Sequence, residues 1–179
     1  VYDGVPLDGA QVALDEAGVI SLTGPMLARG YRRVAGGFAD GWFRTGDLGR
    51  WVDGRLEVLG RADDVIVTGG VNIAPQAVER ILAEQGGVRE ACVVGVDDPE
   101  WGQAVVAAVV PATDPAPDAE DLRAAVRRCA GAAATPKRVV FLPELPLRGP
   151  GKPDRRALRT AVTDAGPGST GLSTITYER

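Results

Sequence analysis

The sequence predicts an α+β protein made of two units and a tail. Short apolar runs separated by turn residues fill residues 1–62, while predicted strands and helices alternate over residues 63–162. Residues 163–179 show no periodicity. We therefore expect a β-rich first unit, a compact second unit with a small sheet flanked by helices, and a loose tail.

In the first unit, turn residues divide two pairs of predicted strands. Residues 10–25 alternate apolar and polar side chains around Gly18, as in a hairpin. Residues 41–60 repeat the pattern around Asp53-Gly54, a pair that favours a tight two-residue turn. No convincing helix is predicted before residue 75.

The second unit begins with a short strand, DDVIVTGG, that runs into a Gly-Gly turn at residues 69–70. Residues 75–87 then read as a helix, because a proline opens the segment and two glycines close it. Residues 88–96 and 103–111 are apolar enough to form two buried strands, with the turn DDPEWG between them.

The rest of this unit follows the same alternation. Asp118 is placed to cap a helix whose apolar face includes Cys129. Residues 137–143 form a further predicted strand and residues 154–162 a short helix. Cys92 and Cys129 both lie in apolar segments, so buried reduced thiols are a better interpretation than a disulfide.

Composition excludes several kinds of chemistry. The chain has no histidine and two cysteines, so Ser–His–Asp catalysis and a four-ligand zinc site are excluded, and we expect no metal site. No apolar run reaches 18 residues, and the start lacks the features of a secretory signal. The start also lacks Met, which suggests a fragment or a processed chain.

Positive charge is concentrated in residues 120–160 and is almost all arginine; the only lysines are Lys137 and Lys152. A solvated face is the simplest interpretation, and anionic small molecules or a partner surface are the alternatives. The segment is too short and too poor in aromatic residues to indicate nucleic-acid binding.

Four short segments could carry chemistry. Asp47 follows Thr45-Gly46, where a carboxylate could accept hydrogen bonds from vicinal ribose hydroxyls, although a turn aspartate that bonds its own backbone fits as well. Arg61 could pair with a ribose or phosphate oxygen. Asp63 lies where the two units meet, as a hinge would, although an ordinary charged linker is the alternative.

The other two segments are rich in glycine. Thr68, Gly69 and Gly70 would let a ligand approach the backbone, although a plain hairpin turn is the simpler interpretation. Lys152 lies in LRGPGKPDRR, a loop in which glycines permit movement and prolines restrict it. Lysine supplies a slim point charge where arginine would supply a planar fork. A surface lysine is the commoner case.

Taken in order, the segments GVISLTGPMLARGY, GWFRTGDLG, GRADDVIVTGGVNIAPQAVE and GPGKPDRRAL closely resemble the C-terminal part of the adenylate-forming enzymes. That superfamily includes acyl-CoA synthetases, peptide-synthetase adenylation domains and luciferases. The resemblance covers about residues 1–160. It implies that residues 1–62 end a large AMP-binding domain and that residues 63–162 form its mobile C-terminal domain, followed by the tail 163–179.

The resemblance also implies a reaction. Family members adenylate a carboxylate with MgATP, release pyrophosphate and then transfer the acyl group, here to coenzyme A. By resemblance, Lys152 is the catalytic lysine, Asp47 and Arg61 contact the nucleotide, Asp63 is the hinge, and Thr68, Gly69 and Gly70 line the thiol tunnel. ATP, Mg²⁺ and coenzyme A are then substrates, and none is tightly bound to this chain. The branch most resembled is bacterial o-succinylbenzoate–CoA ligase of menaquinone synthesis, a cytoplasmic enzyme.

The family's phosphate loop and acyl pocket do not occur in these 179 residues. We therefore expect the larger N-terminal part to be missing and the chain alone to be inactive. Val71 stands where relatives often carry a basic residue, and Pro150 where they carry Ser or Thr. The expected partners are the missing N-terminal part and the small-molecule substrates, with no nucleic acid and no membrane span; a homodimer stays open. Another acyl-CoA synthetase, an amino-acid adenylation domain and a non-catalytic binding module are the alternatives.

Overall fold

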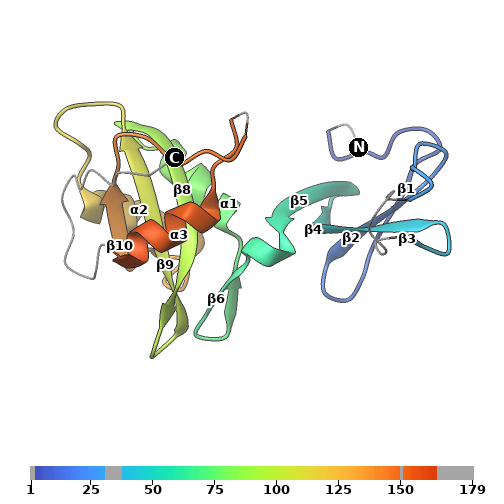
Figure 1. The fold of residues 1–179 in the computed structure, drawn as a ribbon, viewed down its shortest axis with the longest axis horizontal. Helices are drawn as coiled ribbons and strands as arrows, with labels where there is room; N and C mark the ends of the chain where they lie inside the picture. The colour runs from blue at the N-terminus through green and yellow to red at the C-terminus, as the bar shows by residue number, and fades with distance from the viewer. Residues whose placement is uncertain (1–2, 31–37, 150, 165–179) are drawn as a thin grey trace. The chain divides into compact units, whose positions relative to one another are not determined.

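The computed structural model describes residues 3–30, 38–149 and 151–164. The chain divides into two compact units, Val1–Asp63 and Asp64–Arg179. The division falls inside a single turn of 3₁₀ helix, η1 (Ala62–Asp64), one residue after the boundary expected from the sequence. The first unit is built from strands and the second from strands and helices (Figure 1).

The first unit is an antiparallel sheet of five strands among its described residues. The long strand β4 pairs with β2, β3 and β5, while β1 pairs with β2. Asp53 and Gly54 both adopt positive φ, 49° and 74°, and form the tight β4–β5 turn that their identities predict. The strands are β1 (Gln11–Leu14), β2 (Val19–Thr23), β3 (Phe38–Ala39), β4 (Trp42–Val52) and β5 (Arg55–Arg61).

The second unit is a mixed sheet covered by helices. In the described part of the chain the strand order is β10-β9-β6-β7, and β8 pairs with β9. Strand β10 runs parallel to β9, whereas the other pairs are antiparallel. The elements are β6 (Ile66–Thr68), β7 (Val71–Ile73), α1 (Pro75–Ala83), β8 (Val88–Asp98), β9 (Gly102–Pro111), α2 (Ala119–Ala130), β10 (Arg138–Phe141) and α3 (Arg155–Asp164).

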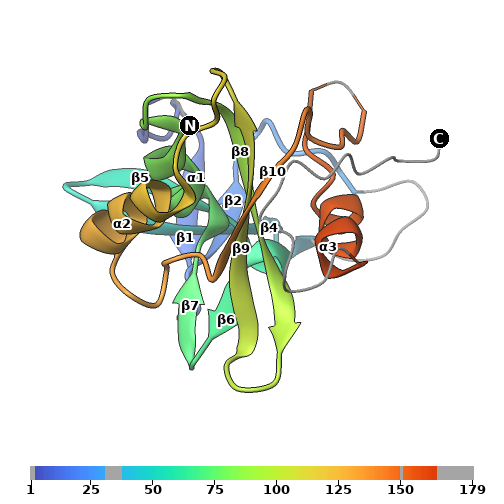
Figure 2. The ribbon, with the colours of Figure 1, turned by 90° about the vertical axis from the view of Figure 1, so that its left-hand side faces the viewer.

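The centre of this sheet is buried on both faces, as the continuous apolar runs of β8 and β9 require. Along β9, Val105, Ala107 and Val109 pack into the core that α1 and α2 cover. The alternate residues of β9 pack into a second core against α3, which contributes Leu158 and Val162. Figure 2 shows α1 and α2 on one side of the sheet and α3 on the other.

Local sequence signals place the helix starts. Pro75 is the first residue of α1, where its missing N–H costs no helical hydrogen bond. The Asp118 carboxylate caps α2 by accepting hydrogen bonds from the backbone N–H groups of Glu120 and Asp121, at 2.7 and 3.1 Å. The α+β fold class expected from the sequence is confirmed. None of the helices among the described residues is both long and apolar enough to cross a membrane.

Some details differ from expectation. The short strands β3 and β7 were not predicted, because two or three residues are too few to show an alternating pattern. Cys92 is buried but Cys129 is exposed, since the buried face of α2 ends at Val126 and Cys129 lies in the last turn. Helix α3 extends through Asp164, two residues into the range 163–179 that was expected to be a tail; residues 165–179 lie outside the described residues.

Candidate functional site

Asp47 and Arg61 face each other across the β4–β5 pair. They are direct partners in the strand register, and Nη1 of Arg61 lies 3.4 Å from Oδ1 of Asp47. Both side chains remain substantially exposed, 40% for Asp47 and 55% for Arg61. The carboxylate therefore contacts a guanidinium from the neighbouring strand and lies within β4, not in a turn.

The residues before Asp47 explain this arrangement. The Thr45 hydroxyl donates to the carbonyl of Ile20 at 2.8 Å and accepts from the Asp47 N–H at 3.0 Å, which fixes the strand on both sides of Gly46. A Cβ built at Gly46 would lie 2.6 Å from Nη2 of Arg61. The Arg61 guanidinium therefore lies close to the Gly46 backbone, where a larger residue would displace it.

Asp63 is exposed in η1, at the last position of the first unit. Its neighbour Asp64 is half-buried and forms an ion pair within the second unit, with Oδ2 3.3 Å from Nε of Arg155. Adjacent aspartates of the sequence DD thus have different surroundings. That difference is not visible in the sequence, where both read as linker charges.

Thr68, Gly69 and Gly70 form the tight turn between β6 and β7. Gly69 and Gly70 have φ values of 54° and 78°, and the Thr68 side chain is buried. The Gly69 N–H donates to the carbonyl of Trp101 at 2.9 Å. A Cβ at Gly69 would lie 2.6 Å from Cε3 of Trp101, whereas a Cβ at Gly70 would meet no atom within 4 Å.

The Trp101 indole also has a lysine over its ring. Nζ of Lys137 lies 5.3 Å from the indole centroid and 2.9 Å from Oδ2 of Asp98. Oδ1 of Asp98 accepts the backbone N–H groups of Glu100 and Trp101. The hydrogen bond from Lys137 holds the pKa of the Asp98 carboxyl below its usual value. The sequence analysis missed this group; Trp101 in the turn DDPEWG and the rarity of lysine were the available signals.

Lys152 is exposed in a small closed loop that leads into α3. The backbone N–H of Arg148 donates to the carbonyl of Lys152 at 2.7 Å, and Leu147 and Pro153 form an isolated antiparallel bridge. Gly149 and Gly151 adopt positive φ, 67° and 71°, which the tight loop requires. The two glycines that the sequence analysis associated with mobility thus shape a defined loop. Pro150 lies outside the described residues.

The Lys152 loop and the Gly69-Gly70 turn lie at opposite ends of the second unit. Both ribbon views show the loop before α3 at one end of the sheet and the β6–β7 turn at the other (Figures 1 and 2). Among the described residues, no hydrogen bond or ion pair connects Lys152 to the turn. The structure therefore brings Asp47 and Arg61 together but keeps Lys152 apart from Thr68, Gly69 and Gly70.

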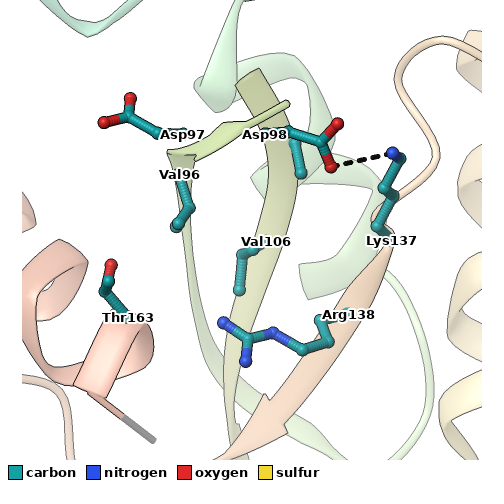
Figure 3. Close-up of a pocket in the computed structure, with 8 residues that line it drawn as sticks. Val96, Asp97, Asp98, Val106, Lys137, Arg138 and Thr163 are labelled. Carbon is teal, nitrogen blue, oxygen red and sulfur yellow. Dashed lines mark hydrogen bonds and ion pairs between the residues drawn. The ribbon is translucent and has the colours of Figure 1, made fainter. Parts of the chain in front are cut away.

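A cavity of about 390 Å³ opens beside the end of α3 and the start of β10. Figure 3 shows Asp97, Asp98, Lys137, Arg138 and Thr163 around it, with the Asp98–Lys137 pair at its rim. Nη2 of Arg138 donates to the Val162 carbonyl at 2.5 Å. The cavity lining includes none of the site residues predicted from the sequence. No cluster of three or more metal-ligating side chains occurs within the described ranges.

Part of the second unit is similar to a known domain. Residues 77–152 match the family model of the AMP-binding enzyme C-terminal domain. The probable 2-succinylbenzoate–CoA ligase of Mycobacterium tuberculosis is 46% identical over 165 residues, which are 88% of this chain and 43% of that protein. The medium/long-chain-fatty-acid–CoA ligase FadD8 of the same organism is 42% identical over 163 residues, 84% of this chain and 28% of that protein.

A solved structure is also similar to this chain. The amide bond synthetase McbA from Marinactinospora thermotolerans matches with a TM-score of 0.82 and 38% sequence identity, over 88% of this chain and 35% of that one. The chain thus spans less than half the length of each of these relatives. The similarity extends beyond the segment matched by the family model and includes both units.

Proposed function

We propose that this chain, which carries the C-terminal domain of the adenylate-forming enzymes, acts as the C-terminal part of an ATP-dependent acid–CoA ligase. The observation that carries the proposal is the 46% identity, over 88% of the chain, to a probable 2-succinylbenzoate–CoA ligase. The reaction is the formation of an acyl-adenylate from an acid and MgATP, followed by transfer of the acyl group to coenzyme A.

We propose o-succinylbenzoate as the acid, which would place the protein in menaquinone synthesis. Identity to the 2-succinylbenzoate enzyme exceeds identity to the fatty-acid enzyme, 46% against 42%. The acyl pocket is not among these residues, so the choice of acid rests on overall similarity. Use of ATP and coenzyme A agrees with a cytoplasmic location, whereas nothing supports the homodimer left open above.

Asp47 and Arg61 are proposed to hold the nucleotide. The exposed Asp47 carboxylate can accept hydrogen bonds from two ribose hydroxyls, while the exposed Arg61 guanidinium can donate to ribose or phosphate oxygens. Their ion pair supports this role, because it brings an acceptor and a fork of donors together on one surface of the first unit.

Lys152 is proposed to act in the first half-reaction. A carboxylate oxygen of the acid attacks the α-phosphorus of ATP, the bond from that phosphorus to the bridging oxygen breaks, and pyrophosphate leaves. Negative charge develops on the phosphate and bridging oxygens, and the Lys152 ammonium stabilises it. Its exposure on a closed loop supports this role, since such a loop can deliver a single cation into another surface.

Thr68, Gly69 and Gly70 are proposed to line the thiol path in the second half-reaction. There the coenzyme A sulfur attacks the acyl carbonyl carbon and AMP leaves with the electron pair of the broken C–O bond. A turn without side chains at positions 69 and 70 leaves room for a narrow substrate. Asp63 is proposed as the hinge between the two half-reactions, a role supported by the division of the chain directly after it.

The function is testable by joining this chain to the N-terminal part of the M. tuberculosis probable 2-succinylbenzoate–CoA ligase. With ATP, Mg²⁺, o-succinylbenzoate and coenzyme A, the chimera should release pyrophosphate and form a thioester, while residues 1–179 alone should do neither. The unaltered M. tuberculosis enzyme serves as control. A folded chimera that releases no pyrophosphate with o-succinylbenzoate, fatty acids or amino acids contradicts the proposal. The choice of acid is tested in the full-length enzyme to which this chain is proposed to belong, since the chimera takes its acyl pocket from the M. tuberculosis part. Thioester formation with fatty acids only by that enzyme would reassign the acid.

A further inference from the structure

Arg155, the first residue of α3, makes an unusually dense set of polar contacts three residues after Lys152. Its Nη1 and Nη2 atoms lie 2.5 and 3.0 Å from Oε1 and Oε2 of Glu79, in a bidentate pair. Its Nε lies 3.3 Å from Oδ2 of Asp64. Nη1 also donates to the Val93 carbonyl at 3.0 Å. One side chain therefore connects α3, α1, β8 and the segment that follows the proposed hinge.

The network is largely removed from water. The exposed fractions of the Arg155, Glu79 and Asp64 side chains are 18%, 17% and 25%. Glu79 is fixed in turn, because Oε1 accepts the backbone N–H of Val93 at 2.7 Å. Burial acts to lower the pKa of the Arg155 guanidinium, but its hydrogen bonds to Glu79 and the negative charges of Glu79 and Asp64 together raise it. A bidentate pair in such surroundings defines orientation as well as charge.

The other end of this network is the Lys152 loop. The Asp154 N–H donates to the Pro146 carbonyl at 2.7 Å, next to the Leu147–Pro153 bridge and the Arg148–Lys152 hydrogen bond. The Asp154 carboxylate accepts the N–H groups of Arg156 and Ala157, so it caps α3. The base of the loop and the start of α3 are therefore one connected piece, and Arg155 anchors that piece to the sheet.

We infer that Arg155 is a positioning residue for Lys152: its contacts with Glu79 and Asp64 set where the loop stands relative to α1 and the hinge segment. Lys152 has no side-chain anchor of its own among the described contacts and is exposed, so its position must come from the backbone that carries it. The neighbouring Arg156 is exposed and enters no ion pair in the described set, which makes it a matched control.

The first test needs only residues 1–179 and does not depend on the proposed function. Arg155→Lys keeps the charge opposite Glu79 but cannot reproduce the fork, and Glu79→Gln keeps the shape but removes the charge. In both variants we expect the Arg148 and Asp154 amides to exchange with deuterium about tenfold faster, with amides at the centre of β9 unchanged. Arg156→Lys should exchange as the original chain does. Unchanged protection at Arg148 and Asp154 in both variants overturns the inference.

The second test rests on the proposed function and uses the chimera described above. Arg155→Lys should lower the turnover of adenylation about tenfold to a hundredfold, because a displaced Lys152 no longer meets the reacting phosphate. The KM for ATP and the transfer of a supplied acyl-adenylate to coenzyme A should stay within about twofold, since Lys152 serves neither. A merely structural loss would lower both half-reactions together, and that outcome contradicts the positioning role. If the unsubstituted chimera is inactive, the proposed function is contradicted. The positioning role of Arg155 is then tested by the deuterium-exchange measurement alone.

Discussion

The two ends of the second unit carry glycine pairs that differ in what surrounds them. At one end, Gly69 and Gly70 form a tight turn, and a Cβ added at Gly69 would lie 2.6 Å from the Trp101 ring. At the other end, Gly149 and Gly151 shape a loop in which a Cβ at either position would meet no described atom within 4 Å. A side chain therefore has little room at Gly69 but open space at Gly149 and Gly151. The two proposed roles differ too: the turn would line the thiol path, and the loop would carry the Lys152 charge to the reacting phosphate.

Removing the positive charge of Lys152 should have the largest effect. In the chimera, Lys152→Ala and Lys152→Arg should each lower adenylation by about two orders of magnitude or more, the scale of one preorganised electrostatic contact. Arginine should not rescue it, because a planar fork cannot occupy the position of a point charge. Pyrophosphate release measures the effect, with Arg148→Lys as a control in the same loop. Normal adenylation by Lys152→Ala would make Lys152 an ordinary surface residue.

A second prediction concerns the first unit, whose residues should contribute only to nucleotide binding. Asp47→Ala should lower kcat/KM for ATP by about two to four orders of magnitude, if two hydrogen bonds of about 1.5–3 kcal/mol each are lost. Asp53→Ala removes an exposed aspartate from the β4–β5 turn and should leave the ATP dependence unchanged. Asp47 would have no part in nucleotide binding if its replacement left kcat/KM for ATP unchanged.

The Gly69-Gly70 turn gives a third prediction, in which one glycine serves as the control for the other. Gly69→Ala and Gly70→Ala both place a side chain at positive φ, but only the first puts a Cβ 2.6 Å from the Trp101 ring. In the chimera, Gly69→Ala should slow transfer of a supplied acyl-adenylate to coenzyme A about tenfold more than Gly70→Ala does, while adenylation stays the same in both. Equal effects of the two substitutions on acyl transfer would mean that contact with the Trp101 ring does not cause the loss.

The smallest effects should come from two helix caps. Asp118→Ala and Asp154→Ala each remove a carboxylate that accepts two backbone N–H groups, so each should lower the free energy of unfolding by about 1 kcal/mol. Only Asp154 caps the helix that begins with Arg155 at the base of the Lys152 loop, so only its loss should slow adenylation, by a few-fold. Urea denaturation and pyrophosphate release measure the two quantities. A change in adenylation after Asp118→Ala would contradict this separation.

Much of the fold could be predicted because its signals are local. The Asp53-Gly54 turn, the Pro75 helix start and the Asp118 cap each depend on a few neighbouring residues. The order of the four motifs also indicated the resemblance to adenylate-forming enzymes without any knowledge of the fold. The exposure of Cys129 was missed because helical periodicity predicts a face but not where the neighbouring elements stop covering it.

The contacts between distant residues could not be predicted. Arg155 and Glu79 are 76 positions apart, and nothing in the run PDRR distinguishes Arg155 from Arg156. The start of α3 distinguishes the two arginines. The side chain of Arg155, the first residue of α3, points toward α1 and β8, whereas that of Arg156 is exposed. Trp101 and Gly69 likewise meet only because the β8–β9 hairpin and the β6–β7 turn pair at Thr68 and Gly102.

The most direct test of the separation between the two ends is to measure both half-reactions in Lys152→Ala and Gly69→Ala versions of the same chimera. Pyrophosphate release reports adenylation, and single-turnover transfer of a supplied acyl-adenylate to coenzyme A reports thioester formation. The predicted result is a crossed pattern, in which Lys152→Ala loses the first activity and keeps the second, and Gly69→Ala keeps the first and loses much of the second. Parallel losses in both variants would contradict the assignment of one end to each half-reaction.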